Sequence, residues 1–242
     1  MRAAGWAKYG RPRGAHLKGG TPIENLIELL RSALELYVER WDWFLNLLLV
    51  HMGLAASAIG IAGTLGLLLG VLIAEHPRYA GAVMGVTNVF YTVPAISLLG
   101  ILIPFLGIGN KTAVAALTVY ALMPMVRNTY AGLTAIDSDI VEAARGMGST
   151  RAQILFRVKL PLALGVILAG LRNMVVMSIS VCSVASFIGA GGLGVAIYRG
   201  ITTYKPAMTF AGSLLIALLA LACDFLLGRV ERHYKKKWRL TI

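Results

Sequence analysis

Five long stretches of this chain contain no aspartate, glutamate, lysine or arginine, and they decide what it can fold into. Several of them exceed the roughly 18 apolar residues expected of a membrane-spanning helix. The uncharged stretches are residues 52–74, 79–110, 112–126, 173–198 and 206–223. Only 14% of the 242 residues are charged, whereas a soluble domain is about a quarter charged. The sequence therefore predicts an integral membrane protein.

These stretches predict helices and not a β-barrel. A barrel strand alternates apolar and polar residues over about ten positions, whereas these stretches are continuously apolar. We therefore expect an all-α membrane protein with about five transmembrane helices, forming one domain over residues 49–228. The expected spans are residues 50–74, 80–106, 112–134, 161–185 and 207–228.

The N-terminal region precedes these spans. Residues 1–20 are basic and glycine-rich and are predicted to form a disordered tail. Thr21, Pro22 and Glu24 fit a capping box with proline at the first helical position. Apolar residues then recur every three or four positions, which predicts an amphipathic helix over 21–48 at the membrane interface. A sixth span here would bury five charged residues, so we reject it: Arg31, Glu35, Glu39, Arg40 and Asp42.

Positive charge gathers in a few segments of the chain. The loop 75–79 contains Arg78, the stretch 127–160 contains five lysine or arginine residues, and the tail 229–242 contains six, so we expect all three to face the cytoplasm. Residues 190–205 then lie outside. The basic tail 1–20 is against the positive-inside tendency, because five spans place it outside as well. Topology accounts for the net charge of +12 without nucleic acid, since aromatic residues do not interleave with the basic ones.

Cysteines and histidines give no sign of a metal site or of a catalytic group. Both cysteines lie in apolar stretches without metal-ligand spacing, and the four histidines are scattered. These residues are Cys182, Cys223, His16, His51, His76 and His233.

The stretch 137–160 is too polar to cross the membrane. Ser138 or Asp139 can cap a first short helix, and Gly148 can end it in the left-handed conformation. Residues 150–153, Thr-Arg-Ala-Gln, form a capping box that opens a second helix. We expect a helix-glycine-helix unit that docks into a groove of another protein.

This loop resembles the EAA signature of binding-protein-dependent ATP-binding-cassette (ABC) permeases. The signature is a Glu-Ala-Ala triplet, a later glycine, and an ending of hydrophobic-x-Leu-Pro. The chain has Glu142-Ala143-Ala144, Gly148 and Val158-Lys159-Leu160-Pro161 at the matching spacing. In that family the loop forms coupling helices in a cleft of the ATPase subunit, which implies that role for residues 139–155. The implied coupling residues are Glu142, Ala143, Ala144, Gly148, Thr150, Gln153, Leu160 and Pro161.

The resemblance also implies a fold, a location and partners. It implies the type I ABC importer permease fold, multi-pass in a bacterial plasma (inner) membrane, with a cytoplasmic C-terminus. The implied partners are cytoplasmic ATPase subunits that bind ATP and Mg²⁺, a second permease subunit (the same or a sister chain), an external substrate-binding protein and membrane lipid. The chain itself has no phosphate-binding loop, so we expect it to hold no cofactor and not to be an enzyme.

Further segments resemble the osmoprotectant branch, whose permeases serve quaternary amines such as glycine betaine, carnitine and choline. They are Thr92–Pro94, Tyr120–Pro124, Arg127–Thr129 and Ile188–Gly194. The branch often has Gln-Thr where this chain has Tyr91-Thr92. An ABC permease for an amino acid or a sulfonate is an alternative. An ATP-independent channel or secondary carrier is a more distant one, because no inverted repeat or acidic cluster for ion coupling is evident.

Pro94 lies in the middle of the second expected span. Proline removes a helix hydrogen bond, and irregular backbone at membrane depth is tolerated mainly beside a cavity or a protein interface. Tyr91, Thr92 and Pro94 are therefore candidates for the translocation path. The alternative is an ordinary kink in which Thr92 bonds its own backbone.

Two charged residues lie within the expected spans. Arg172 is deep in the fourth span, where a charge needs a partner or a position inside the bundle. Asp224 is one possible partner, although Asp224 could equally pair with Arg229 or with hydrated headgroups. A structural role is expected for both.

Two glycine patterns have structural explanations. Residues 189–194, Gly-Ala-Gly-Gly-Leu-Gly, fit the dinucleotide fingerprint but follow an apolar span and not a strand. They are expected to form an external hinge or gate, or a loop that ends a helix. Gly66 and Gly70 form a G-x-x-x-G pair, which predicts close helix packing.

Overall fold

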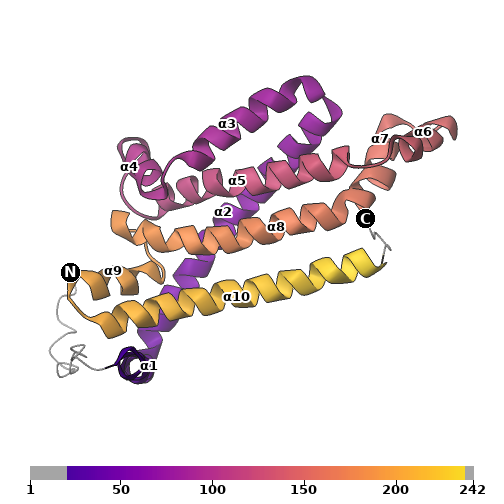
Figure 1. Ribbon diagram of the computed structural model, residues 1–242. Helices are drawn as coiled ribbons and strands as arrows, with labels where there is room; N and C mark the ends of the chain where they lie inside the picture. The colour runs from indigo at the N-terminus through magenta and orange to yellow at the C-terminus, as the bar shows by residue number, and fades with distance from the viewer. Residues whose placement is uncertain (1–20, 238–242) are drawn as a thin grey trace.

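A computed structural model describes residues 21–237, and it is helical throughout its regular elements (Figure 1). No strand occurs within this range, which confirms the all-α prediction. The disordered tail predicted for residues 1–20 lies outside the described range. The helices are α1 (Pro22–Glu39), α2 (Trp41–Glu75), α3 (Ala80–Thr92), α4 (Ala95–Leu106), α5 (Asn110–Thr134), α6 (Ser138–Gly146), α7 (Arg151–Ile154), α8 (Leu160–Cys182), α9 (Gly194–Thr202) and α10 (Pro206–Lys237). Shorter helical elements are the 3₁₀ helices η2 (Pro77–Tyr79) and η4 (Ser183–Ile188) and the π-helix η3 (Leu155–Lys159).

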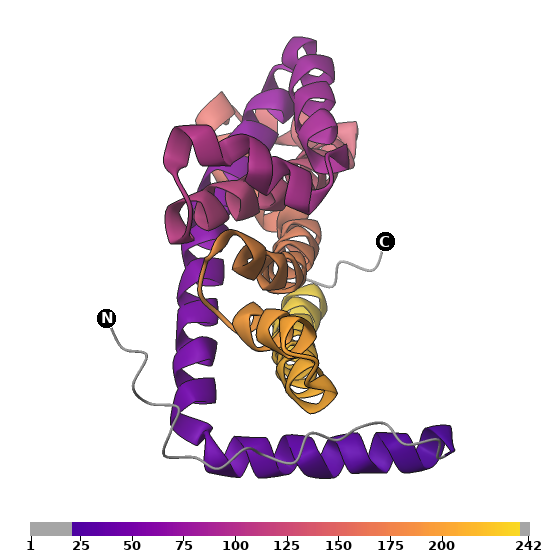
Figure 2. The ribbon, with the colours of Figure 1, turned by 90° about the vertical axis from the view of Figure 1, so that its left-hand side faces the viewer.

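The amphipathic helix begins as predicted but ends earlier. The Thr21 hydroxyl accepts a hydrogen bond from the Glu24 amide at 3.3 Å, and the Glu24 carboxylate accepts one from the Thr21 amide at 2.8 Å. The helix is interrupted at Arg40, and the chain turns there, so that α1 lies across the end of α2 (Figure 2). Residues 41–48, predicted to belong to the interfacial helix, instead form the start of α2. The apolar side chains in this stretch continue the long helix into the core.

Helix α1 is held against α10. The Tyr37 hydroxyl donates a hydrogen bond to the carbonyl of Ala211 at 2.7 Å. Burial raises the pKa of Tyr37, so this hydroxyl stays protonated as a donor. Ala33 and Leu36 are buried in the same cluster as Met208 of α10. The inner face of α1 therefore packs on protein, and its outer face is left exposed.

Within residues 21–237, three helical segments are long and apolar enough to cross a membrane by themselves: Trp41–Glu75, Arg151–Ile188 and Pro206–Tyr234. The pair Pro77–Thr92 and Ala95–Leu106 makes a fourth if it is one span. The protein is therefore multi-pass. The remaining expected span corresponds to α5, whose 25 residues extend about 37 Å at 1.5 Å per residue. Polar residues within α5 keep its hydropathy below that of the other spans.

The second expected span is broken and not merely kinked. Helices α3 and α4 are bent by 100° relative to each other. Val93 between them is extended, with φ −65° and ψ 128°, because the residue before a proline is driven out of the helical region. Pro94 therefore ends one helix and begins the next.

The last helix is longer than expected. Residues 229–237 continue α10 as helix, whereas the sequence predicts a separate tail after residue 228. Glu231, within this extension, is buried. Residues 238–242 lie outside the described range.

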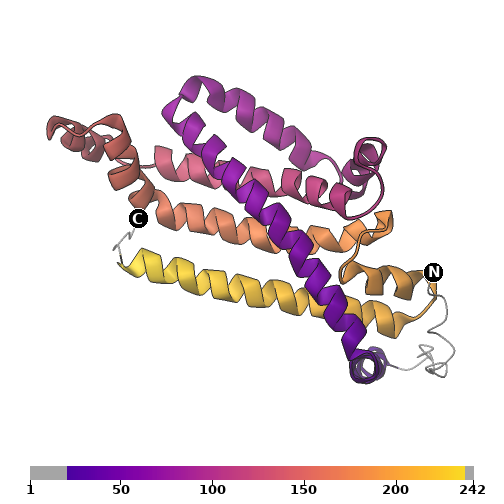
Figure 3. The same ribbon diagram turned by 180° about the vertical axis from the view of Figure 1, so that it is seen from behind.

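The core forms where α2 crosses α5 and α8, which lie side by side (Figures 1 and 3). A Cβ atom at Gly66 would lie 2.7 Å from the Cβ of Met125, and one at Gly70 would lie 2.5 Å from the Cβ of Thr129. The close packing predicted for this glycine pair is thus confirmed. Gly170 in α8 is equally close to Asn128 in α5. Small residues bring all three backbones together.

The molecule has two distinct ends. Helices α6 and α7 and the C-terminal end of α10 lie at one end (Figure 1). Helices α1, α4 and α9 lie at the other. The loop 137–160 and the end of α10 thus fall on the same side of the spans, as the distribution of lysine and arginine predicts.

Gly70→Ala is expected to lower the thermal stability of the detergent-solubilised protein. The added methyl group would overlap Thr129, and overpacking of this kind costs about 1–3 kcal/mol. Gly60→Ala, in the same helix, is the matched control, because a Cβ there meets nothing within 4 Å. Equal melting temperatures for the two variants would contradict the glycine contact.

Candidate functional site

The loop between α5 and α8 is built from two capped helices. Helix α6 is capped by Asp137, whose carboxylate accepts a hydrogen bond from the Asp139 amide at 2.9 Å. The cap is thus one residue before the earlier of the predicted caps, Ser138 and Asp139. Gly148 follows α6 with φ 81°, the left-handed conformation predicted for it. Its amide donates to the carbonyl of Arg145 at 2.9 Å.

The second helix opens with the predicted capping box. The Gln153 amide donates to the Thr150 hydroxyl at 3.3 Å, and the Thr150 amide donates to the Gln153 side chain at 2.8 Å. Helix α7 is only four residues long and passes through η3 directly into α8. Because Leu160 and Pro161 begin α8, no loop separates α7 from this spanning helix.

The predicted coupling residues differ in exposure. Glu142 and Ala143 are exposed, whereas Ala144 is buried. Met147 is 81% exposed and Phe156 is 66% exposed, so two large apolar side chains lie uncovered on this loop. Sequence reasoning missed both. Each is a large apolar residue within a polar loop, and this contrast could have identified it as a docking residue.

An ion pair joins the loop to α2. The Lys159 ammonium, at the end of η3, lies 2.6 Å from the carboxylate of Glu75, the last residue of α2. Both side chains are largely shielded, with 19% and 27% exposure. Leu155, the first residue of η3, and Leu160, the first residue of α8, pack on one buried cluster formed by α2, α5 and α8. The loop is thus connected to three spanning helices.

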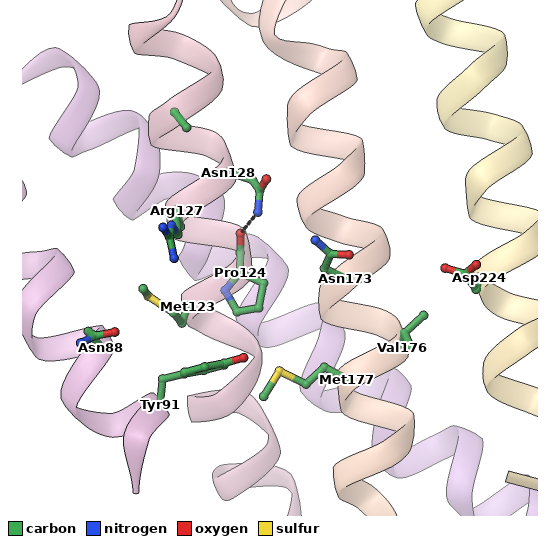
Figure 4. A pocket seen from close by; sticks show the side chains of 11 residues that line it. Asn88, Tyr91, Met123, Pro124, Arg127, Asn128, Asn173, Val176, Met177 and Asp224 are labelled. Atoms are coloured by element: carbon green, nitrogen blue, oxygen red, sulfur yellow. Dashed lines mark hydrogen bonds between the residues drawn. The ribbon is translucent and has the colours of Figure 1, made fainter. Parts of the chain in front are cut away.

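A polar groove of about 580 Å³ lies among α3, α5, α8 and α10 (Figure 4). Its walls combine three asparagines, two charged residues and several apolar side chains. They are Asn88, Tyr91, Met123, Pro124, Arg127, Asn128, Ala131, Asn173, Val176, Met177 and Asp224.

Of the three residues predicted for the translocation path, the structure places Tyr91 in this groove. The Thr92 hydroxyl donates to the carbonyl of Val89 at 2.8 Å, which is the local backbone bond foreseen as the alternative. Neither Thr92 nor Pro94 lines the groove. Pro94 contributes indirectly, because the break at this residue ends α3 just after Tyr91.

The intramembrane charges pair with each other. The Arg172 guanidinium donates to both carboxylate oxygens of Asp224 at 2.6 Å each, and to Glu231 at 3.4 Å. Asp224 therefore pairs with Arg172, whereas Arg229 lies over the ring of Phe225 at 4.4 Å. Sequence reasoning missed Glu231, although it lies seven residues after Asp224 and so on the same helix face.

The glycine-rich loop after α8 is held at several points. Gly189 and Gly192 have φ of 73° and 97°. The Gly191 amide donates to the Asn110 side chain at 3.0 Å. The Leu193 amide donates to Nδ1 of buried His51 at 3.3 Å, which leaves Nε2 to donate to the carbonyl of Ile179 at 3.1 Å.

These bonds fit the interpretation of the glycine-rich loop as one that ends a helix. With no strand before it in the described chain, it does not form a dinucleotide site. Nor do residues 21–237 contain a group of three or more His, Cys, Asp or Glu side chains that could hold a metal ion.

The chain matches a known protein family. The family described as "Binding-protein-dependent transport system inner membrane component" matches residues 65–239. The chain is 39% identical to the carnitine transport permease protein OpuCB of Listeria monocytogenes, covering 77% of this chain and 86% of that protein. It is 38% identical to the glycine betaine/carnitine/choline permease protein OpuCD of Bacillus subtilis, covering 85% and 90%.

A third relative and a solved structure agree with this. The osmoprotectant import permease protein OsmW of Salmonella typhimurium is 43% identical, covering 75% of this chain and 86% of that protein. An inward-facing structure of the MetNI methionine ABC transporter superposes with a TM-score of 0.75 at 25% identity, covering 81% of this chain and 98% of the matched chain. The expected type I importer permease fold is thereby confirmed.

Arg172→Gln and Asp224→Asn are each expected to lower the melting temperature of the solubilised protein, because each leaves the other charge without its main partner. The double variant should lose less than the sum of the two single losses. Arg31→Gln is the control, since its pair with Glu35 is exposed on both sides and should contribute little. Additive losses would contradict the pairing.

Proposed function

This chain belongs to the family of binding-protein-dependent transport system inner membrane components and is a permease subunit of an ABC importer, and we propose that it carries small quaternary amines. The relatives at 38–39% identity are permeases for carnitine, or for glycine betaine, carnitine and choline. The methionine transporter supports the fold but is more distant in sequence, at 25% identity. An osmoprotectant substrate is therefore better supported than an amino acid or a sulfonate.

The loop 137–160 is the proposed contact with the ATPase. Three features support this role: an exposed Glu142 and Ala143, an uncovered apolar Met147, and two helices capped on their own residues. A rigid, self-capped unit keeps its shape when it docks into another protein. ATP and Mg²⁺ would be bound by that ATPase, and this chain would contribute no catalytic residue.

The end of the molecule that carries this loop is proposed to face the cytoplasm, together with the C-terminal end of α10. The turn 75–79, the loop and the last helix carry most of the basic residues of the described chain, as the positive-inside tendency requires. The end formed by α1, α4 and α9 would receive substrate from an external binding protein. A second permease subunit would complete the path.

Coupling is proposed to run through the Glu75–Lys159 ion pair. When ATP draws the ATPases together, α7 moves with its docking cleft, and η3 carries the displacement into α8. Through its ion pair with Glu75, Lys159 then displaces the end of α2, so that α2 and α8 move together relative to α5. The two end states differ in their affinity for substrate and ATP, and this difference drives alternating access.

ATP-dependent uptake by the reconstituted importer tests this function. Proteoliposomes that contain the permease and its ATPase, with binding protein outside and ATP inside, are expected to accumulate radiolabelled glycine betaine. The purified permease alone should hydrolyse no ATP. Uptake that persists without ATP would favour a channel or secondary carrier, and specific hydrolysis by the isolated chain would refute the subunit assignment.

Gly148→Leu is expected to abolish uptake while membrane insertion stays normal. A branched side chain at φ 81° costs roughly 1–2 kcal/mol and would distort the turn between α6 and α7. Gly148→Asn is the control, because asparagine tolerates the left-handed conformation and should retain most of the uptake. Normal uptake by the leucine variant would show that the loop is not the coupling element.

A further inference from the structure

The asparagines within three spanning helices converge on one place. Asn88 of α3, Asn128 of α5 and Asn173 of α8 all line the groove of about 580 Å³ (Figure 4). The only other asparagine of these helices is Asn110, the first residue of α5. Amide groups at membrane depth are costly unless they meet water or a polar partner. The Asn128 amide donates to the carbonyl of Pro124 at 2.7 Å, whereas Asn88 and Asn173 have no such partner within residues 21–237. Two amide groups from separate helices thus face the groove, which indicates a path for a polar solute.

The groove also contains a cation without a counter-ion. The structure gives Arg127 no ion pair or hydrogen bond within residues 21–237. Arg127 lies seven residues before the end of α5, about 10 Å along the helix axis. Arg172, by contrast, is bound by two carboxylates. A free guanidinium at this depth faces a hydrated cavity or a bound anion.

The remaining wall of the groove suits a positively charged group of a small ligand. Tyr91 extends into the groove beside Met123 and Met177 (Figure 4). A tyrosine ring attracts a quaternary ammonium by cation-π contact, and thioethers offer polarisable contacts. Asp224 adds negative charge on the far wall, although Arg172 holds both of its oxygens. Arg127 and this aromatic wall are thus separate attachment points.

We infer that Arg127 binds the carboxylate of a zwitterionic quaternary amine in this groove, with Tyr91 facing its ammonium group. The inference rests on the proposed function and narrows it. Glycine betaine and carnitine carry a carboxylate, whereas choline carries a hydroxyl in its place. Guanidinium groups bind carboxylates in a bidentate geometry that a hydroxyl cannot match. Recognition by Arg127 therefore favours zwitterions over choline at the permease itself.

Uptake by Arg127→Gln tests this. Initial rates for glycine betaine and carnitine are expected to fall at least tenfold in reconstituted importer, while the rate for choline changes less than twofold. Arg127→Lys, which keeps the charge without the bidentate geometry, should give intermediate rates. Lys111→Gln is the matched control, because it removes a cation from the same helix but outside the groove, and should leave all three rates unchanged.

Equal loss of all three substrates in Arg127→Gln would overturn the inference, because it would indicate a structural role. Unchanged rates for the zwitterions would also overturn it. Failure of the wild-type importer to take up any quaternary amine would instead overturn the proposed function, and the inference with it. These outcomes are distinct.

Equilibrium dialysis removes the influence of the external binding protein, which could itself reject choline. Importer embedded in nanodiscs is dialysed against radiolabelled glycine betaine or choline. Arg127→Gln is expected to weaken glycine betaine binding at least tenfold and to leave choline binding unchanged. Equal affinity of the wild-type and variant importers for glycine betaine would contradict a carboxylate contact.

Discussion

The close approach of α2, α5 and α8 at glycine residues is the contact on which the rest of the structure depends. Gly66 and Gly70 bring α2 onto α5, and Gly170 brings α8 onto the same helix. Within lipid, such packing replaces the hydrophobic drive that holds soluble helices together. It makes α5 the central element, with the groove on one of its faces. It also fixes the ends of α5 and α8 between which the proposed coupling loop lies.

The polar groups of the spans fall into two kinds. Arg172 with Asp224 and Glu231, and His51 with its two backbone partners, are satisfied within the protein and tie helices together. The polar side chains of Asn88, Arg127 and Asn173 instead face the groove. This division separates groups that hold the fold from groups available to a solute.

Local patterns predicted the local structure well. The capping boxes at Thr21 and Thr150 and the left-handed Gly148 follow from residues within one turn of each other. Contacts between residues that lie far apart in the sequence were harder to predict. The break at Pro94 depends on what surrounds the freed backbone, so the sequence could not distinguish it from a kink. The pair of Lys159 with Glu75 joins residues 84 positions apart, and the groove depends on helix rotations that hydropathy does not encode.

Site-specific photo-cross-linking tests the central claim most directly, namely that the loop end of this permease receives the ATPase. Met147 on the loop and Ile108 at the opposite end are similarly exposed, at 81% and 76%. A photoreactive residue at position 147 of the assembled importer is predicted to capture the ATPase subunit, and one at position 108 to capture none. Capture of the ATPase from position 108, with none from position 147, would contradict both the coupling loop and the orientation.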